Sequence, residues 1–228
     1  MIHWREVPMP EGVKALPVDP ARDFPVPWFV QWLDGKPEFR IADRDKLKLA
    51  VAERRCWVCG RRLDNRCTYL IGPMCAVNRI SGEPPSHPAC AEYSVRTCPF
   101  LSRPSMDRRE GGLPAMPEGG CPVAGGFMIE RNPGVTLLWT GRTPGSTTVS
   151  DGRGGVAFQL HDPLSLTWWA EGRAATKAEV AASIESGVPL LRAMCDRQGE
   201  QRRLDAHLAL DRAIERAQPL LATIGAHR

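Results

Sequence analysis

The placement of cysteine constrains this chain more than any other feature of its sequence. Seven of the eight cysteines fall within residues 56–121, and two of them, Cys56 and Cys59, form a Cys-x2-Cys pair followed directly by glycine. A second pair, His87 and Cys90, lies three residues apart. Two such pairs are typical of zinc sites, in which four thiolate and imidazole ligands surround one ion. The sequence therefore predicts a metal site with zinc as the cofactor and these four residues as ligands.

The expected local structure lets each pair converge on one ion. Glycine after Cys-x2-Cys allows a tight turn whose backbone amides support both sulfurs. In the second pair, Ser86 is the expected N-cap of a helix and Pro88 its first-turn proline. Because residues three apart in a first helical turn face one way, His87 and Cys90 can bind the same ion.

Two strand-like pieces, residues 68–71 and 76–80, separate the two pairs and are joined by Gly72 and Pro73. The turn at residues 56–60, which we call the knuckle, the expected hairpin and the helix that supplies two ligands together resemble the treble-clef zinc finger. The resemblance covers residues 56–98 and implies a zinc-binding fold without any particular activity, because treble clefs serve many functions. The segment is also similar to uncharacterised proteins of GC-rich bacteria and their phages, which implies no activity either.

The other cysteines of this region leave room for a second site. They could bind a second zinc ion, or combine with the first pair to hold an iron–sulfur cluster, which also takes four thiolates. Their spacing matches neither pattern well, although His87 favours zinc at the first site. The candidate ligands of a second site are Cys67, Cys75, Cys98 and Cys121, with Cys75 and Cys98 favoured.

The pattern argues against catalysis at the zinc. A catalytic zinc keeps one position open for water, whereas four good protein ligands are present here. His-Asn-His endonucleases place a histidine on the treble-clef hairpin, but this chain offers Asn78 and Arg79 there. The His-x-Glu element of zinc deaminases is also missing. We expect a non-catalytic site, with a metalloenzyme that uses a second metal or iron site as an alternative.

Basic residues are concentrated around the cysteines. Residues 44–109 contain thirteen Lys and Arg against six Asp and Glu, whereas the whole chain carries a net charge of only +4. Such an excess is typical of a surface that contacts nucleic acid, although arginine is also common in Ala/Gly/Pro/Arg-rich sequences. The leading hypothesis is contact with nucleic acid or a nucleic-acid-bound protein. A protein–protein adaptor with purely structural zinc is the other alternative. The candidate contact residues are Arg55, Arg61, Arg62, Arg66, Arg79 and Arg103.

The rest of the chain predicts an α+β fold: β-hairpins and the treble-clef-like module first, then a helical C-terminal region. Residues 1–55 combine an extended Pro-rich arm, a hairpin that turns at Asp34-Gly35, and a short helix capped by Asp43. Residues 56–98 form the zinc module and residues 99–122 a Pro/Gly/Arg-rich connector without regular structure.

Residues 123–228 predict a hairpin, with strands at 127–131 and 135–140, a loop over 141–155, a strand at 156–160 and helices beyond. Thr176 and Glu179 form a capping box. Pro189 is expected to end that helix, and Pro219 to kink or end the last one. Without a run of about 18 apolar residues or a signal peptide, we expect a cytoplasmic protein that does not enter a membrane, in an oligomeric state that the sequence leaves open.

Overall fold

The computed structural model describes residues 3–103, 121–122, 132–150 and 155–222. Helices and small antiparallel sheets are mixed along this part of the chain, which confirms the mixed helix-and-sheet class. The expected strand at 127–131 lies outside the described residues. No described helix combines the length and apolar character that a membrane span needs.

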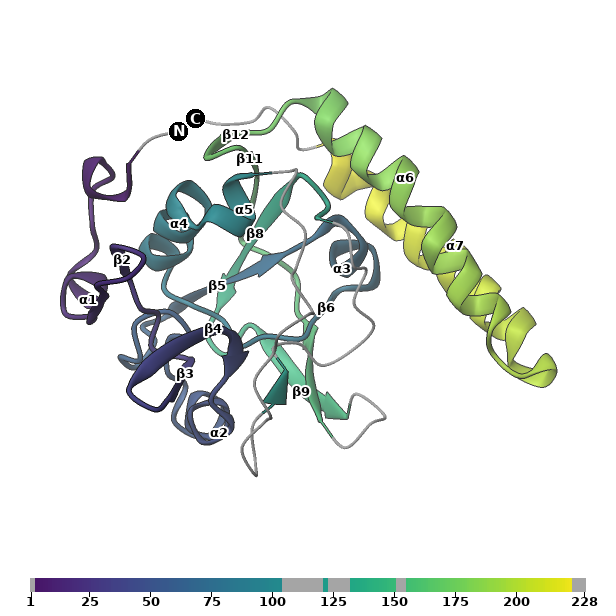
Figure 1. Cartoon of the computed structure of the whole chain (residues 1–228). Coiled ribbons are helices and arrows are strands. Elements are labelled where there is room, and N and C mark those ends of the chain that lie inside the picture. Colours follow the sequence, from purple (N-terminus) through teal and green to yellow (C-terminus); the bar gives the residue numbers. More distant parts are fainter. Residues whose placement is uncertain (1–2, 104–120, 123–131, 151–154, 223–228) are drawn as a thin grey trace.

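A four-stranded antiparallel sheet runs through the middle of the molecule (Figure 1). One face packs against a core that includes Tyr69, Trp139 and Phe158, and the other face meets helix α4 (Pro88–Thr97) through Leu138 and Val95. The strands, in sheet order, are β12 (Arg173–Ala174), β11 (Ser165–Ala170), β8 (Thr136–Arg142) and β5 (Arg66–Ile71).

Two expectations, for residues 76–80 and 141–155, are wrong, and both segments contribute to a second antiparallel sheet of β6, β10 and β9. Residues 76–80 do not form a strand: helix α3 (Pro73–Asn78) occupies most of them, and only β6 (Ile80–Ser81) is extended. Pro73 at the first helical position has a φ preset for a helix, which the short apolar pattern did not reveal. Residues 141–155 are not all loop, because β9 (Ser146–Ser150) pairs along its whole length with β10 (Val156–Leu160).

The N-terminal hairpin forms as predicted. Strand β3 (Val30–Leu33) pairs with β4 (Lys36–Ala42) across Asp34 and Gly35, whose φ angles of 48° and 74° are those that a two-residue primed turn requires. Asp43 caps helix α2 (Arg44–Glu53) by accepting two backbone N–H groups. The connector is less irregular than expected, because it begins with α5 (Pro99–Ser102) and ends with β7 (Cys121–Pro122), which pairs with β4.

The Pro-rich arm is not merely extended. It contains a 3-10 turn η1 (Trp4–Glu6), a helical turn α1 (Glu11–Lys14) and the two-residue strands β1 (Val18–Asp19) and β2 (Phe24–Pro25). Short turns fit between the prolines: α1 begins directly after Pro10, which is its N-cap residue and has an extended conformation. Trp4, Val7 and Val13 are buried against the cysteines of the predicted metal site, so the arm is part of the core.

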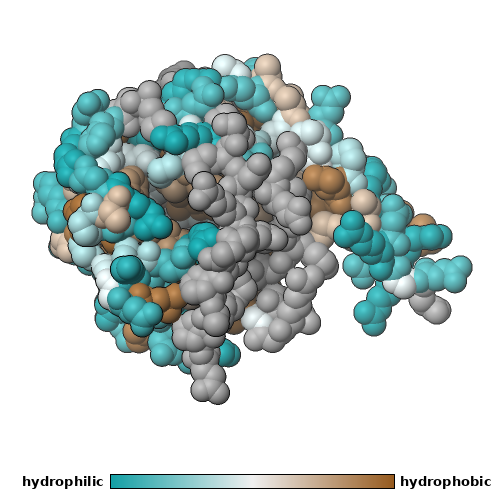
Figure 2. Space-filling view, in the orientation of Figure 1, coloured by the Kyte–Doolittle hydropathy of each residue, from teal (hydrophilic) through white to brown (hydrophobic). Residues whose placement is uncertain are grey.

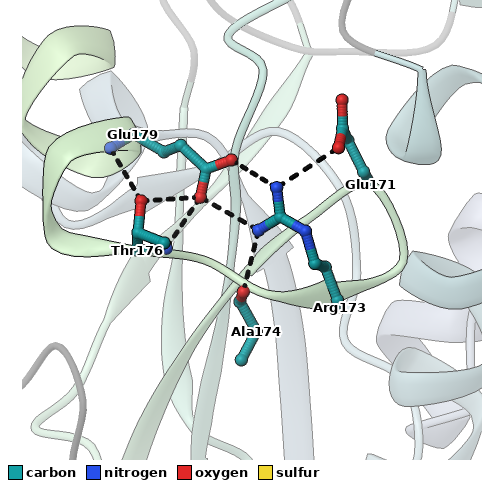
Figure 3. A network of polar contacts seen from close by, with 5 residues as sticks. All are labelled: Glu171, Arg173, Ala174, Thr176 and Glu179. Atoms are coloured by element: carbon teal, nitrogen blue, oxygen red, sulfur yellow. Dashed lines mark hydrogen bonds and ion pairs between the residues drawn. The ribbon is translucent and has the colours of Figure 1, made fainter.

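Two long helices, α6 (Lys177–Asp196) and α7 (Glu200–Ala222), end the described chain and extend away from the sheets (Figure 1). The capping box is confirmed: Thr176 accepts the backbone N–H of Glu179, whose carboxylate accepts that of Thr176 and pairs with Arg173 (Figure 3). Pro189 and Pro219 do not end these helices. Pro189 lies on an exposed side of α6, where water can satisfy the carbonyl group that lacks an amide partner.

Candidate metal centre

The first ligand pair lies in a tight knuckle. Cys56 donates its backbone N–H to the Arg61 carbonyl at 2.7 Å, and Gly60 donates to the Cys56 carbonyl at 2.8 Å. Gly60 has a φ of 74°, and a methyl group there would lie 2.5 Å from the Trp28 ring. Glycine is therefore required both by the turn and by the close approach of Trp28.

The second pair is placed where a strand-like segment enters α4. Thr68 and Ser86 exchange backbone hydrogen bonds of 2.8 and 2.9 Å, which hold the segment just before His87 against β5. The N-cap of α4 is His87, not Ser86 as expected, and Pro88 is the first helical residue. Because Ser86 belongs to the bridge with Thr68, the helix starts one residue later.

The structure brings all four predicted ligands together. The sulfur atoms of Cys56, Cys59 and Cys90 and a ring nitrogen of His87 all lie within 4.8 Å of one another. Nδ1 of His87 lies 3.4 Å from Sγ of Cys59 and 4.0 Å from Sγ of Cys90. A tetrahedral zinc ion with Zn–S of about 2.3 Å and Zn–N of about 2.0 Å sets its ligand atoms roughly 3.5–3.8 Å apart. The donor set therefore fits one tetrahedral ion.

Hydrogen bonds outside the ligand set orient these groups. Sγ of Cys56 accepts the backbone N–H groups of Cys59 and His87, each at 3.4 Å. Nε2 of His87 lies 2.9 Å from the Arg62 carbonyl oxygen and 3.9 Å from the Asp64 carboxylate. Since a carbonyl only accepts, Nε2 carries the proton and donates it, which leaves Nδ1 as the metal-facing atom.

The pKa values of the cluster residues are shifted because the side chains are buried and hydrogen-bonded to one another. Hydrogen bonds with the side chains of Cys56 and then Cys59 raise the pKa of His87 to about 10. Burial raises the pKa of Cys56, but hydrogen bonds from Cys59, Cys90 and His87 outweigh burial and lower it overall. Hydrogen bonds with Cys56 and then Cys59, followed by burial, raise the pKa of Cys90. Without a metal ion the cluster thus retains protons that a metal ion must displace, so binding is coupled to proton release.

The site is closed by the N-terminal arm. Cys56, Cys59 and Cys90 are buried, and Val7 and Val13 from the arm pack against them. Gly12 of α1 lies so close that a methyl group there would be 2.7 Å from Sγ of Cys59. A buried site with four protein ligands is the arrangement typical of structural zinc.

The knuckle and the helix of the expected motif are present, but the hairpin between them is not. After the knuckle the chain continues through β5, α3 and β6, and β5 pairs along its length with β8 from much later in the chain. Within the described part of this segment, the Thr68–Ser86 bridge is the nearest equivalent of a hairpin. The treble clef therefore remains a resemblance.

No second cluster forms among the described cysteines. Cys67 is buried in the sheet core, donates its thiol hydrogen to the Pro144 carbonyl at 3.5 Å, and has a pKa raised by burial. Cys75 lies on α3 and Cys98 between α4 and α5, and neither belongs to a described group of three potential ligands. Because the side chain of Cys121 lies outside the described residues, a second site stays a prediction.

Three of the six candidate arginines lie together near the metal site, and the other three lie elsewhere or are paired with an acidic residue. Arg55 pairs with Glu53 at 2.7 Å, and Arg79 pairs with Asp162 at 2.7 Å and stands over the Trp139 ring. Arg103 follows α5, where its carbonyl accepts a hydrogen bond from Asn132. The exposed members at the knuckle and at the start of β5 are Arg61, Arg62 and Arg66.

Sequence reasoning missed one member of this basic surface. Arg142, at the end of β8, is the direct cross-strand partner of Arg66 at the start of β5, and both are exposed. No local pattern marks Arg142, because its position depends on a strand pairing between distant segments.

Comparisons of the chain with protein families, with curated proteins and with solved structures give no match.

Proposed function

We propose that the protein binds one zinc ion through Cys56, Cys59, His87 and Cys90, and that this ion is structural. The observation that carries the proposal is the convergence of four ligand atoms within 4.8 Å in a buried pocket. The histidine favours zinc over an iron–sulfur cluster, which ordinarily takes four thiolates. With all four positions filled by protein, no open position remains for a catalytic water.

Metal analysis of the purified protein tests this proposal directly. We expect about one zinc per chain, and X-ray absorption should give three sulfur neighbours at about 2.3 Å and one nitrogen at about 2.0 Å. Protein that is folded but free of metal, or that carries iron with a charge-transfer colour, would reject it. A second equivalent of zinc would instead support the site that includes Cys121.

A second proposal concerns the arginines around the centre: we infer that they bind the phosphates of nucleic acid. Arg66 and Arg142 are directly opposite on an antiparallel pair, so their side chains leave the same face of the sheet. Like charges in that position destabilise a sheet, and a bound anion removes the cost. No ion pair joins either of them, or Arg61 or Arg62, to another described residue.

These arginines lie next to the metal centre. The Arg62 carbonyl accepts the His87 hydrogen bond, and Thr143, next to Arg142, donates to the Asn65 carbonyl at 3.1 Å. The knuckle and the end of β8 are therefore tied together, and zinc holds the knuckle in place. A rigid basic surface suits phosphate contact, which fixes position without reading sequence.

Fluorescence anisotropy with duplex and single-stranded oligonucleotides at several salt concentrations tests the second proposal. On duplex DNA, affinity should fall with salt at a log–log slope of about −0.9 per phosphate contact. Arg66→Ala with Arg142→Ala should make this slope shallower by up to about two contacts. Arg202→Ala, exposed on α7, is the matched control and should leave it unchanged. Zinc-loaded, folded protein that binds no oligonucleotide at low salt would exclude nucleic acid, and an acidic protein surface would then be the remaining partner.

A further inference from the structure

Among the described residues, contacts between the α6–α7 pair and the rest of the protein reach as far as Leu191 on α6 and Leu210 on α7, and the loop end of the pair, its tip, lies beyond them. Helix α3 packs on both helices, with Val77 in a cluster with Leu191, Leu210 and Ala213. Two polar pairs also join the helices, each at 2.8 Å: Arg192–Asp211 beside Leu191 and Leu210, and His207–Asp196 closer to the tip. The tip of the helix pair therefore projects from the body of the protein (Figure 1).

The outer face of α7 near this tip is apolar. Leu204 and Leu208 are 69% and 45% exposed, and they lie one helical turn apart on the side opposite the buried Leu210, Ala213 and Ala217. Figure 2 shows hydrophobic surface on the projecting pair among mainly hydrophilic side chains. Two large apolar side chains on one ridge of a protruding helix mark a contact surface.

The charges at the two ends of this ridge indicate what covers it. Glu200 lies four residues before Leu204, and Arg212 lies four residues after Leu208, so all four share one ridge. Both charged side chains are exposed, and no ion pair joins either to another described residue. Along the ridge the order is acidic, Leu, Leu, basic. A second copy in the antiparallel direction therefore places an acidic residue opposite a basic one and a leucine opposite a leucine.

We propose that two copies of this chain associate through α7 in an antiparallel, two-fold arrangement centred near Ala206. In this register Leu204 of one copy meets Leu208 of the other, and Glu200 of each meets Arg212 of the other, as a two-fold contact requires. A parallel arrangement would place like charges opposite each other. The body packs on α7 from Leu210 onward, on the side opposite Leu204 and Leu208, so each body lies on the far side of its own helix from the other copy.

One helical ridge buries little surface, so the dimer is weak and its population depends on concentration. Sedimentation velocity from micromolar to millimolar protein should show the mass rising toward that of a dimer. The variant with Leu204→Glu and Leu208→Glu should stay monomeric throughout. Leu49→Glu is the matched control, since Leu49 is a helical leucine that is 41% exposed on α2. It should behave as the parent protein does.

Charge reversal tests the register. Glu200→Arg should weaken the dimer, because arginine would then face Arg212 of the other copy, and adding Arg212→Glu should restore it. Circular dichroism must show unchanged helix in every variant. A parent protein that stays monomeric at millimolar concentration, or a dimer that survives Leu204→Glu with Leu208→Glu, would overturn the proposal. A double charge variant as weak as the single one would overturn the antiparallel register.

Discussion

Gly12 of the N-terminal arm lies directly against the sulfur of Cys59, and a methyl group in place of its hydrogen would be 2.7 Å from that atom. The contact couples a segment far from the metal ligands in sequence to the ligand set itself. Trp4 and Val13 of the same arm are buried in one core cluster with Cys56, Cys59 and Cys90. The arm therefore forms one side of the candidate metal centre, and we expect changes in the arm to alter metal binding there.

Gly12→Ala should weaken zinc binding and lower the free energy of unfolding by about 1–3 kcal/mol, the usual cost of overpacking a close contact. Zinc affinity is measured by competition with a chromophoric chelator, and stability by urea denaturation. Gly199→Ala is the control, because a methyl group there meets nothing within 4 Å. An unchanged zinc affinity in Gly12→Ala would show that the arm does not constrain Cys59.

Gly60 combines two constraints that can be separated experimentally. Gly60→Ala has to adopt a φ of 74° and also displace the Trp28 ring, so it should cost about 2–4 kcal/mol. Gly35 has the same φ but open space around it, so Gly35→Ala should cost only the conformational part, about 1 kcal/mol. Urea denaturation of both variants measures the difference. Equal costs would mean that Trp28 moves aside freely.

Sequence reasoning succeeded where a few neighbouring residues decide the structure. The Asp34-Gly35 turn and the Thr176–Glu179 capping box are local hydrogen-bond and dihedral requirements, and both were confirmed. The four candidate ligands were found for a similar reason, since each pair carries its own turn or helix start. Their convergence is confirmed, whereas the identity of the ion stays a prediction.

Sequence reasoning failed where contacts between distant segments determine the local structure. The apolar residues of α3 are compatible with a strand, and their packing against α6 and α7 favours the helix. Strand β9 has little apolar character and exists because β10 pairs with it. The partner of Arg66 was invisible for the same reason, because only the pairing of β5 with β8 places Arg142 beside it.

Cys59→Ser should lower the free energy of unfolding by more than about 4 kcal/mol in the presence of zinc, because the proposed structural ion would contribute its binding energy to folding. Cys195→Ser, half-buried in α6 outside the cluster, should cost no more than about 1 kcal/mol. A chelator should reduce the stability of the parent protein to near that of Cys59→Ser. If the chelator leaves the parent unchanged, the folded state does not depend on metal.

The cap of α6 gives a pH-dependent prediction. Hydrogen bonds from Arg173, and then from Thr176, lower the pKa of Glu179 to about 2 from its ordinary value of 4.5. A carboxylate with a lowered pKa in the folded state adds stability at pH values above its unfolded pKa, and this stability is lost as the pH falls toward the folded value. The contribution should therefore be constant from pH 7 to pH 5 and decline below about 4.5.

Glu179→Gln isolates this ionic part, because glutamine at the third helical position can still accept the Thr176 backbone N–H of the capping box. The Arg173–Glu179 pair is partly exposed to solvent, so screening limits the cost of the substitution at pH 7 to about 0.5–1 kcal/mol. Urea denaturation of both proteins at a series of pH values should show a difference that is flat between pH 7 and pH 5 and shrinks on further acidification. Glu185→Gln, exposed on the same helix, should show no difference at any pH. A Glu179→Gln cost that grew on acidification would contradict the lowered pKa, because the protonated carboxyl and the amide make equivalent neutral contacts with Arg173.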